Sequence, residues 1–176
     1  MKKTILHAVS MLAAVVILLP QSAAAGPKGD TIVDVAIKAN GPGGAFEGQL
    51  STLIAALQAA DPSVMDALSG NGQLTVFAPT DEAFAALGLD ASNVGSAFST
   101  ETLTEILLYH VAKGNRNSAA VVGSKQIRTL QGEFINVSGT ALTDNVGRSS
   151  DIIVTDIAAS NGVIHVIDEV ILPFTP

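Results

Sequence analysis

Apolar residues in the first half of the chain recur three and four positions apart, which is the spacing of a buried helix face. This pattern predicts five helices, over residues 31–39, 46–60, 62–68, 81–87 and 100–111. Asp30, Asp61, and either Thr80 or Asp81 precede three of these helices. Their side-chain oxygens suit N-caps, because they accept hydrogen bonds from the free N–H groups of a first turn.

The last third of the chain consists of short β-type runs separated by turn pairs. Six strands are predicted there, over residues 127–130, 133–137, 141–143, 152–157, 163–167 and 170–172. The turn pairs are Gln131-Gly132, Ser138-Gly139 and Asn161-Gly162. One earlier strand is predicted over 74–78. Helices that come early and strands that cluster late favour an α+β fold over an alternating parallel α/β fold.

The N-terminal pattern is that of a secretory signal peptide. A basic start at Lys2 and Lys3 is followed by a short apolar run, Ile5 to Leu19, and by small residues up to Ala25. The run is shorter than the roughly 20 residues of a membrane-spanning helix. We therefore predict cleavage after Ala25 and export, to the periplasm or the extracellular medium, with an uncleaved membrane anchor as the alternative.

Residues 26–176 then have the length of a single domain, which is large enough to bury a core without disulfides. The chain has no cysteine, which excludes disulfides, thiolate metal sites and a cysteine nucleophile. After Ala25, seven basic and sixteen acidic side chains give a formal charge of −9 (7 − 16). Such a charge disfavours nucleic acid and anionic membranes as partners. No later segment is long and apolar enough to span a bilayer.

Three segments go beyond general patterning: Thr75–Phe84, Leu107–Val111, and Asn161–Pro173. In sequence, order and spacing they resemble the two signature blocks and the central Tyr-His motif of the fasciclin (FAS1) domain family. The resemblance covers about residues 30–174. It implies a wedge of mainly antiparallel strands with several packed helices.

The resemblance also implies a function outside the cell, in adhesion through a cell-surface or extracellular protein or glycan. It implies binding without catalysis and without a cofactor. Some family members carry an apolar small molecule such as a carotenoid or lipid, and this is the alternative function. The oligomeric state does not follow from the sequence.

Most residues of the two signature blocks have a structural interpretation, as core rings, caps and turns. Phe77 and Phe84 suit the core, Asp81 suits a cap, and Asn161-Gly162 suits a tight turn. The full signature set is Phe77, Pro79, Thr80, Asp81, Phe84, Asn161, Gly162, His165 and Asp168. His165 is interpreted as a hydrogen-bonded histidine within a strand.

Two pairs are candidate adhesion residues by the resemblance. Tyr109 and His110 occupy the positions of the Tyr-His motif, which is implicated in receptor contact in matrix proteins. Tyr109 also fits the apolar face of its helix, so a core role is the competing interpretation. Asp156 and Ile157 match an adhesive Asp-Ile pair of animal relatives, although the flanking residues differ. The competing role for Asp156 is to keep an edge strand soluble.

Nothing in the chain has the spacing of a catalytic or metal-binding motif. Only His110 and His165 remain after the predicted cleavage, on different elements, and no Gly-x-Ser-x-Gly or Gly-rich phosphate loop occurs. The adjacent acids Asp81-Glu82 and Asp168-Glu169 point to different faces of their elements. We therefore expect no metal and no catalytic residues, with an exported hydrolase as a further, less favoured hypothesis.

Overall fold

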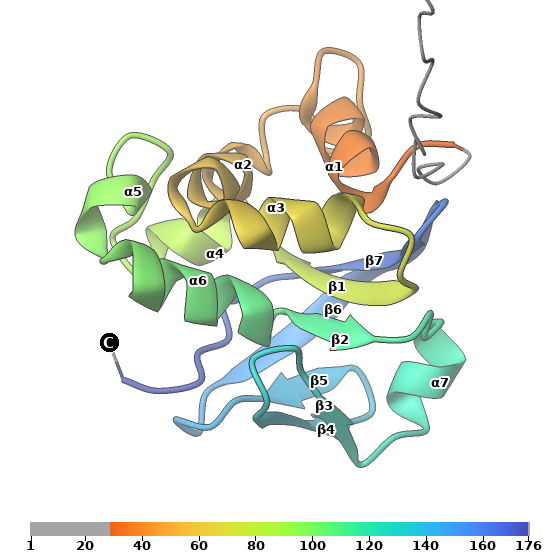
Figure 1. Ribbon diagram of the computed structural model, residues 1–176. Coiled ribbons are helices and arrows are strands. Elements are labelled where there is room, and N and C mark those ends of the chain that lie inside the picture. The colour runs from red at the N-terminus through yellow and green to blue at the C-terminus, as the bar shows by residue number, and fades with distance from the viewer. Residues whose placement is uncertain (1–28, 176) are drawn as a thin grey trace, which may run out of the picture.

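The computed structural model describes residues 29–175, so the predicted signal peptide lies outside the described residues. Figure 1 shows helices α1 to α6 gathered along one side of the central strands β1 and β7, with α7 apart from them. Strands β3, β4 and β5 lie on the other side of β7 from these helices. The mixed helix-and-strand architecture confirms the predicted α+β class.

Seven helices are present among the described residues, and most begin at a polar side chain that accepts from their first turn. Their bounds are α1 Ile32–Asn40, α2 Ser51–Ala59, α3 Pro62–Ser69, α4 Asp81–Ala85, α5 Val94–Ala97, α6 Thr100–Tyr109 and α7 Ser118–Val122. Thr31, rather than the predicted Asp30, caps α1, where it forms a reciprocal capping box with Asp34. The predicted second helix is shorter than expected, because residues before Ser51 form turns.

The strands form one seven-stranded sheet in the order β2-β1-β7-β6-β5-β4-β3. Their bounds are β1 Leu74–Pro79, β2 Val111–Lys113, β3 Gln126–Arg128, β4 Phe134–Ser138, β5 Ala141–Thr143, β6 Ser149–Ala159 and β7 Gly162–Ile167. Every neighbouring pair is antiparallel except β1 and β7, which run parallel through the centre. The burial of all six residues in both β1 and β7 fits this central position.

The two outer strands of this sheet, β2 and β3, meet and give it a barrel-like form. Ala112 and Thr129 form an antiparallel bridge, and Leu130 N–H donates to Val111 C=O at 2.6 Å. This contact brings the segment that leaves α6 against the segment that enters β4. Residues about 20 positions apart in sequence thereby line one surface.

Buried apolar side chains fill two layers, one on each side of the central strands. The layer under the helices is built from residues such as Leu53, Val64, Phe84 and Leu103. The layer inside the curved sheet consists of Phe77, Tyr109, Ala112, Val121, Ile127, Ile135, Leu142, Ile152, Ile167 and Ile171. The predicted core positions of Phe77 and Phe84 agree with this packing, since both rings are almost fully buried.

The prediction of a last strand over 170–172 is wrong. Strand β7 ends at Ile167, and the backbone groups of this later segment bond to side chains instead of a neighbouring strand. Ile171 N–H donates to His110 Nε2, and Leu172 N–H donates to Asp144 Oδ2 at 2.9 Å. The segment therefore closes one end of the inner core layer as a strap rather than as part of the sheet.

Candidate functional site

Tyr109 and His110 end helix α6, and both side chains point inward. Tyr109 has no exposed surface and His110 is 3% exposed. The Tyr109 hydroxyl donates to Phe134 C=O at 2.9 Å, across 25 positions of sequence. Burial raises the pKa of Tyr109 to about 12, so its hydroxyl stays protonated and remains a donor at neutral pH. Tyr109 thus fixes the start of β4 from inside the sheet.

His110 joins helix α6 to the C-terminal strap through both ring nitrogens. Nδ1 lies 2.8 Å from Ile106 C=O and must donate, while Nε2 accepts from Ile171 N–H at 3.3 Å. This pattern requires the neutral Nδ1–H tautomer. Burial lowers the pKa of His110 to about 4, because the charged ring would lose its hydration.

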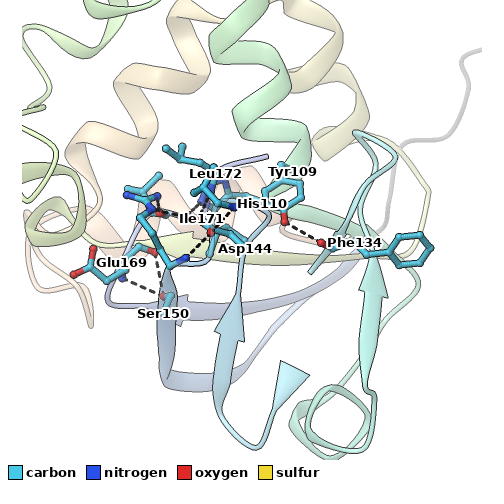
Figure 2. A network of polar contacts seen from close by, with 11 residues as sticks. Tyr109, His110, Phe134, Asp144, Ser150, Glu169, Ile171 and Leu172 are labelled. Carbon is cyan, nitrogen blue, oxygen red and sulfur yellow. Dashed lines mark hydrogen bonds and ion pairs between the residues drawn. The ribbon is translucent and has the colours of Figure 1, made fainter. Parts of the chain in front are cut away.

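Asp144 bonds the same strap from the turn between β5 and β6 (Figure 2), and Arg148 of that turn bonds it as well. The Asp144 carboxylate is fully buried and accepts from the N–H groups of Val146, Arg148 and Leu172 and from Arg148 Nε. Arg148 in turn donates to Val170 C=O. The carboxylate is thereby paired and fully hydrogen-bonded, as a buried charge must be.

These contacts place the predicted adhesion pair of Tyr109 and His110 in a polar network of the interior. Neither side chain has surface to offer a partner in this structure, so an adhesive role for them stays a prediction. Any such role is indirect, through the segments at Phe134 and Ile171 that they hold in place.

Asp156 lies where strand β6 bulges between its contacts to β7. Its φ of 60° is the only left-handed backbone angle of a non-glycine among the described residues. The exposed carboxylate accepts from Ser118 N–H at 2.8 Å and from Ser118 Oγ at 2.5 Å. These hydrogen bonds lower the pKa of Asp156 and tie α7 to the sheet. Ile157, which follows, is half-buried and packs on the helix-side core layer.

His165 is fully buried behind this bulge, and its ring stacks on Phe77. Nδ1 accepts from Asp156 N–H at 3.3 Å, and Nε2 donates to Arg116 C=O at 2.8 Å. Ser118, Asp156 and His165 are the residue types of a catalytic triad, but their connections differ. The serine bonds the carboxylate, and both imidazole nitrogens are engaged by backbone, so this group holds no activated nucleophile.

The signature residues at the start of α4 serve two different helices. Thr80 caps α4 by accepting from Ala83 N–H at 3.3 Å. Asp81 instead accepts from Thr52 N–H at 2.8 Å and Ser51 N–H at 3.2 Å, at the start of α2. The prediction that Asp81 caps its own helix is therefore wrong. Pro79 ends β1, which leads into this junction.

Asn161 does more than form the predicted turn with Gly162. The Asn161 side chain is buried and accepts from Ile32 N–H at 2.8 Å, while its Nδ2 donates to Leu68 C=O and Gly70 C=O. It therefore joins the start of α1 to the end of α3.

Asp168 has a similar role at the opposite end of β7. Its carboxylate accepts from Asp151 N–H at 2.7 Å and from Ser150 Oγ at 3.2 Å. Strand β7 is thus fixed at both ends by signature side chains.

A narrow apolar cavity of about 20 Å³ lies between the helices and the sheet. Its walls include Ile32, Leu53, Phe77, Leu107, His110 and Ile164. This volume has room for about one water molecule. Within residues 29–175, His, Asp and Glu side chains nowhere form a group of three that would hold a metal ion. No helix in the same range has the length and apolar character needed to cross a membrane.

A larger hollow of about 340 Å³ opens on the surface where β2 meets β3. We call it the basic hollow, and its lining is Lys113, Arg116, Arg128, Thr129, Leu130 and Gly132. Sequence reasoning missed this site, because its cations are scattered over residues 113–128 with no motif spacing. Only the closure of β2 on β3 brings them together.

Comparison with known proteins gives one consistent family. The family model of the Fasciclin domain matches residues 48–173 of this chain. Protein sll1483 of Synechocystis is 43% identical over 155 residues, which cover 86% of this chain and 78% of that protein. Immunogenic protein MPB70 of Mycobacterium bovis is 39% identical over 129 residues, 71% of this chain and 64% of its own length.

A solved structure gives the same fold. The FAS1 domain pair from the insect cell adhesion molecule Fasciclin I matches with a TM-score of 0.56 and 23% sequence identity. The match covers 70% of this chain and 45% of that chain.

Proposed function

This chain belongs to the fasciclin domain family, and from that premise we propose that it is a non-catalytic adhesion module that holds a protein or glycan outside the cytoplasm. The observation that carries the proposal is that the buried polar side chains are already engaged in hydrogen bonds within the fold. Both buried histidines bond backbone groups through each ring nitrogen, and the buried carboxylate of Asp144 is fully occupied. These groups stabilise the fold and leave the exposed loops for binding.

The predicted export supports the same function. The sequence predicts a signal peptide over residues 1–25, followed by a domain that needs no disulfide. Its location would then be the periplasm or the extracellular medium. The fold is shared with an insect cell adhesion molecule, and we extend adhesion to this chain as a proposal.

The contact surface is proposed on the outer face of the sheet, near the basic hollow, rather than on the buried Tyr109 and His110. Large apolar side chains that stand exposed include Val122 on α7, Phe134 on β4 and Ile153 on β6. Exposed aromatic side chains of this kind are enriched where proteins bind partners. The carrier alternative lacks room in this conformation, since the interior cavity holds about one water.

The test is adhesion to an arrayed protein, because one weak site gains strength when several copies bind together. Residues 26–176 are displayed at high density on beads and offered to bacterial and animal cells and to envelope and matrix glycans. We expect the beads to capture a cell or a glycan, and we expect excess soluble protein to prevent this capture. A double variant, Phe134→Ser with Ile153→Ser, should lose most of it, while Ile37→Ser on α1 serves as the matched control.

Capture no greater than that of an inert bead-bound protein would contradict the proposal. Turnover in a broad hydrolase screen, abolished by a His110 variant that still folds, would replace it with catalysis. The thermal unfolding midpoint of each variant is measured first, so that loss of fold is not taken for loss of binding.

A further inference from the structure

We propose that the basic hollow binds an acidic sugar residue, with the arginines holding its carboxylate and Phe134 covering an apolar face of its ring. The inference rests on the proposed adhesive function and names its site and partner class. The volume of the basic hollow, about 340 Å³, lies within the range of small-ligand sites, which begins near 300 Å³.

Each arginine side chain makes one hydrogen bond to a nearby backbone carbonyl before any ligand arrives. Arg116 Nε donates to Lys113 C=O at 3.4 Å, and Arg128 Nε donates to Gly132 C=O at 3.2 Å. No hydrogen bond or ion pair recorded among residues 29–175 uses the Nη groups of either arginine or the Lys113 ammonium. These donors are therefore available for a planar oxyanion, which arginine recognises through two parallel N–H bonds.

The cations are unusual for this molecule. The hollow gathers three of the seven basic side chains that follow Ala25, in a domain with sixteen acidic ones. The ion pairs recorded in the described residues join Lys38 to Asp30 and Arg148 to Asp144, both outside the hollow. The hollow is thus a local positive site on an acidic protein, suited to one anionic group rather than to an extended polyanion.

Phe134 supplies the apolar part of the site. It stands directly opposite Arg128 in the β3–β4 ladder, so both side chains project from the same face. Figure 2 shows its ring pointing outward, away from the Tyr109 hydroxyl that holds its carbonyl. Phe134 is 43% exposed, although phenylalanine favours the interior. A flat apolar face beside cations matches a sugar ring that carries a carboxylate.

The backbone of the hollow is also bonded to helix α6 and to strand β2. Gln131 N–H donates to Leu108 C=O and Leu130 N–H to Val111 C=O. Thr129 bonds Glu133 C=O through both its N–H and its hydroxyl. A preorganised wall of this kind lowers the entropy cost of binding.

The test is titration of ¹⁵N-labelled protein, residues 26–176, with a galacturonic acid trimer, followed by NMR. We expect saturable shifts of the amides of 113–116 and 128–134, which weaken as salt is raised. A galactose trimer, which has the same ring without the carboxylate, should bind at least tenfold more weakly. Inorganic phosphate and vesicles of phosphatidylglycerol are the other two probes.

Two sets of variants separate the parts of the site. Arg116→Gln with Arg128→Gln should lower affinity for the acidic trimer roughly tenfold or more. The control, Lys38→Gln with Lys125→Gln, removes the same charge outside the hollow. It should change the affinity for the acidic trimer less than twofold. Phe134→Leu should weaken binding of the acidic trimer several-fold and leave the binding of phosphate unchanged. Thermal unfolding establishes that each variant folds.

Several results would overturn the inference: no saturable shift with the acidic trimer, shifts centred away from the hollow, or equal loss in the control variant. Phosphate that binds as tightly as the trimer would reduce the site to a simple anion site, and binding of vesicles alone would assign it to a lipid headgroup. If wild-type beads still capture cells or glycans while the trimer does not bind, the hollow fails and the adhesive function stands. If neither binds, both fail.

Discussion

Gly162 is the first residue of β7 and pairs with Leu74 at the start of β1. A Cβ at this position would lie 2.0 Å from Leu74 C=O and 2.9 Å from the Ile32 side chain, and the φ of 157° disfavours other residues. We expect Gly162→Ala to lower the free energy of unfolding by about 3 kcal/mol, from overpacking and backbone strain together. Urea unfolding measures the loss.

Gly72 is the matched control for this substitution, because a Cβ there meets nothing within 4 Å and its φ is not left-handed. Gly72→Ala should change the stability by less than about 0.5 kcal/mol, as surface substitutions usually do. Equal stability of the two alanine variants would show that the close approach of the two chain segments is not maintained in solution.

His110 gives the fold a pH dependence of its own. The unfolded ring takes up a proton near its ordinary pKa of 6.5, whereas the folded ring does so only near 4. Protonation therefore favours the unfolded chain, and the stability is full above pH 6.5 and falls as the pH drops toward 4. Near pH 4 this titration lowers the free energy of unfolding by about 3 kcal/mol relative to pH 7. Urea unfolding at several pH values between 7 and 4 measures it.

The control is His110→Asn, which has no titrating ring and should show a shallower fall over this window. Hydrogen bonds lower the pKa of Asp34, Asp61, Asp90 and Asp156 below the ordinary 3.8, so these carboxylates also begin to cost stability as the pH approaches 4. They are the same in both proteins, so the difference between the two curves reports His110. Parallel curves for the wild type and the variant would contradict a neutral, buried His110.

At the scale of elements, helix α2 depends on a cap from outside its own segment. Its N-cap residue, Leu50, has no side-chain hydrogen bond, and the Asp81 carboxylate supplies the acceptors 30 positions later. We expect Asp81→Ala to cost about 1–2 kcal/mol, from the lost cap and the lost charge near a helix start. Hydrogen exchange should quicken at residues 51–54 more than elsewhere.

Glu82→Ala removes the neighbouring carboxylate, which has no recorded hydrogen bond within residues 29–175, and should change neither stability nor exchange appreciably. Asp81→Asn keeps one acceptor and should fall between the two. An Asp81→Ala variant with unchanged exchange at the start of α2 would show that the cap contributes nothing.

The elements that sequence reasoning found and missed differ in what forms them. The longer helices and the strands β3 to β7 follow from local apolar spacing, so their positions agree with the prediction within five residues, whereas the strand predicted over 170–172 does not form. The three missed elements are α5, α7 and β2, each of five residues or fewer. Strand β2 exists because it pairs with β1 about 36 positions earlier, which no local pattern reveals.

The same distinction holds for the sites. Burial of Phe77 and the cap at Thr80 follow from residue type and neighbours. The function of Asp81 in α2 depends on tertiary contacts, as does the hub formed by Asn161. The basic hollow depends on the meeting of β2 and β3, so its residues carry no common signal along the chain.

For the whole molecule, the small interior cavity predicts that the purified protein is colourless and carries no lipid. A carotenoid or acyl chain needs far more than about 20 Å³, unless α1 moves away from the sheet. Visible absorption spectra and mass spectrometry of a solvent extract check this. A stoichiometric co-purified ligand would favour the carrier alternative and would require an opened form of the helix layer.

The meeting of β2 and β3 has a consequence for crowding at a surface. Open sheets invite a second chain to add a strand along an unpaired edge, which leads to fibres or aggregates at high density. Here the outermost strands use part of their edges on each other. Many copies held at high density would therefore remain separate folded units, as the proposed adhesion through many weak contacts requires.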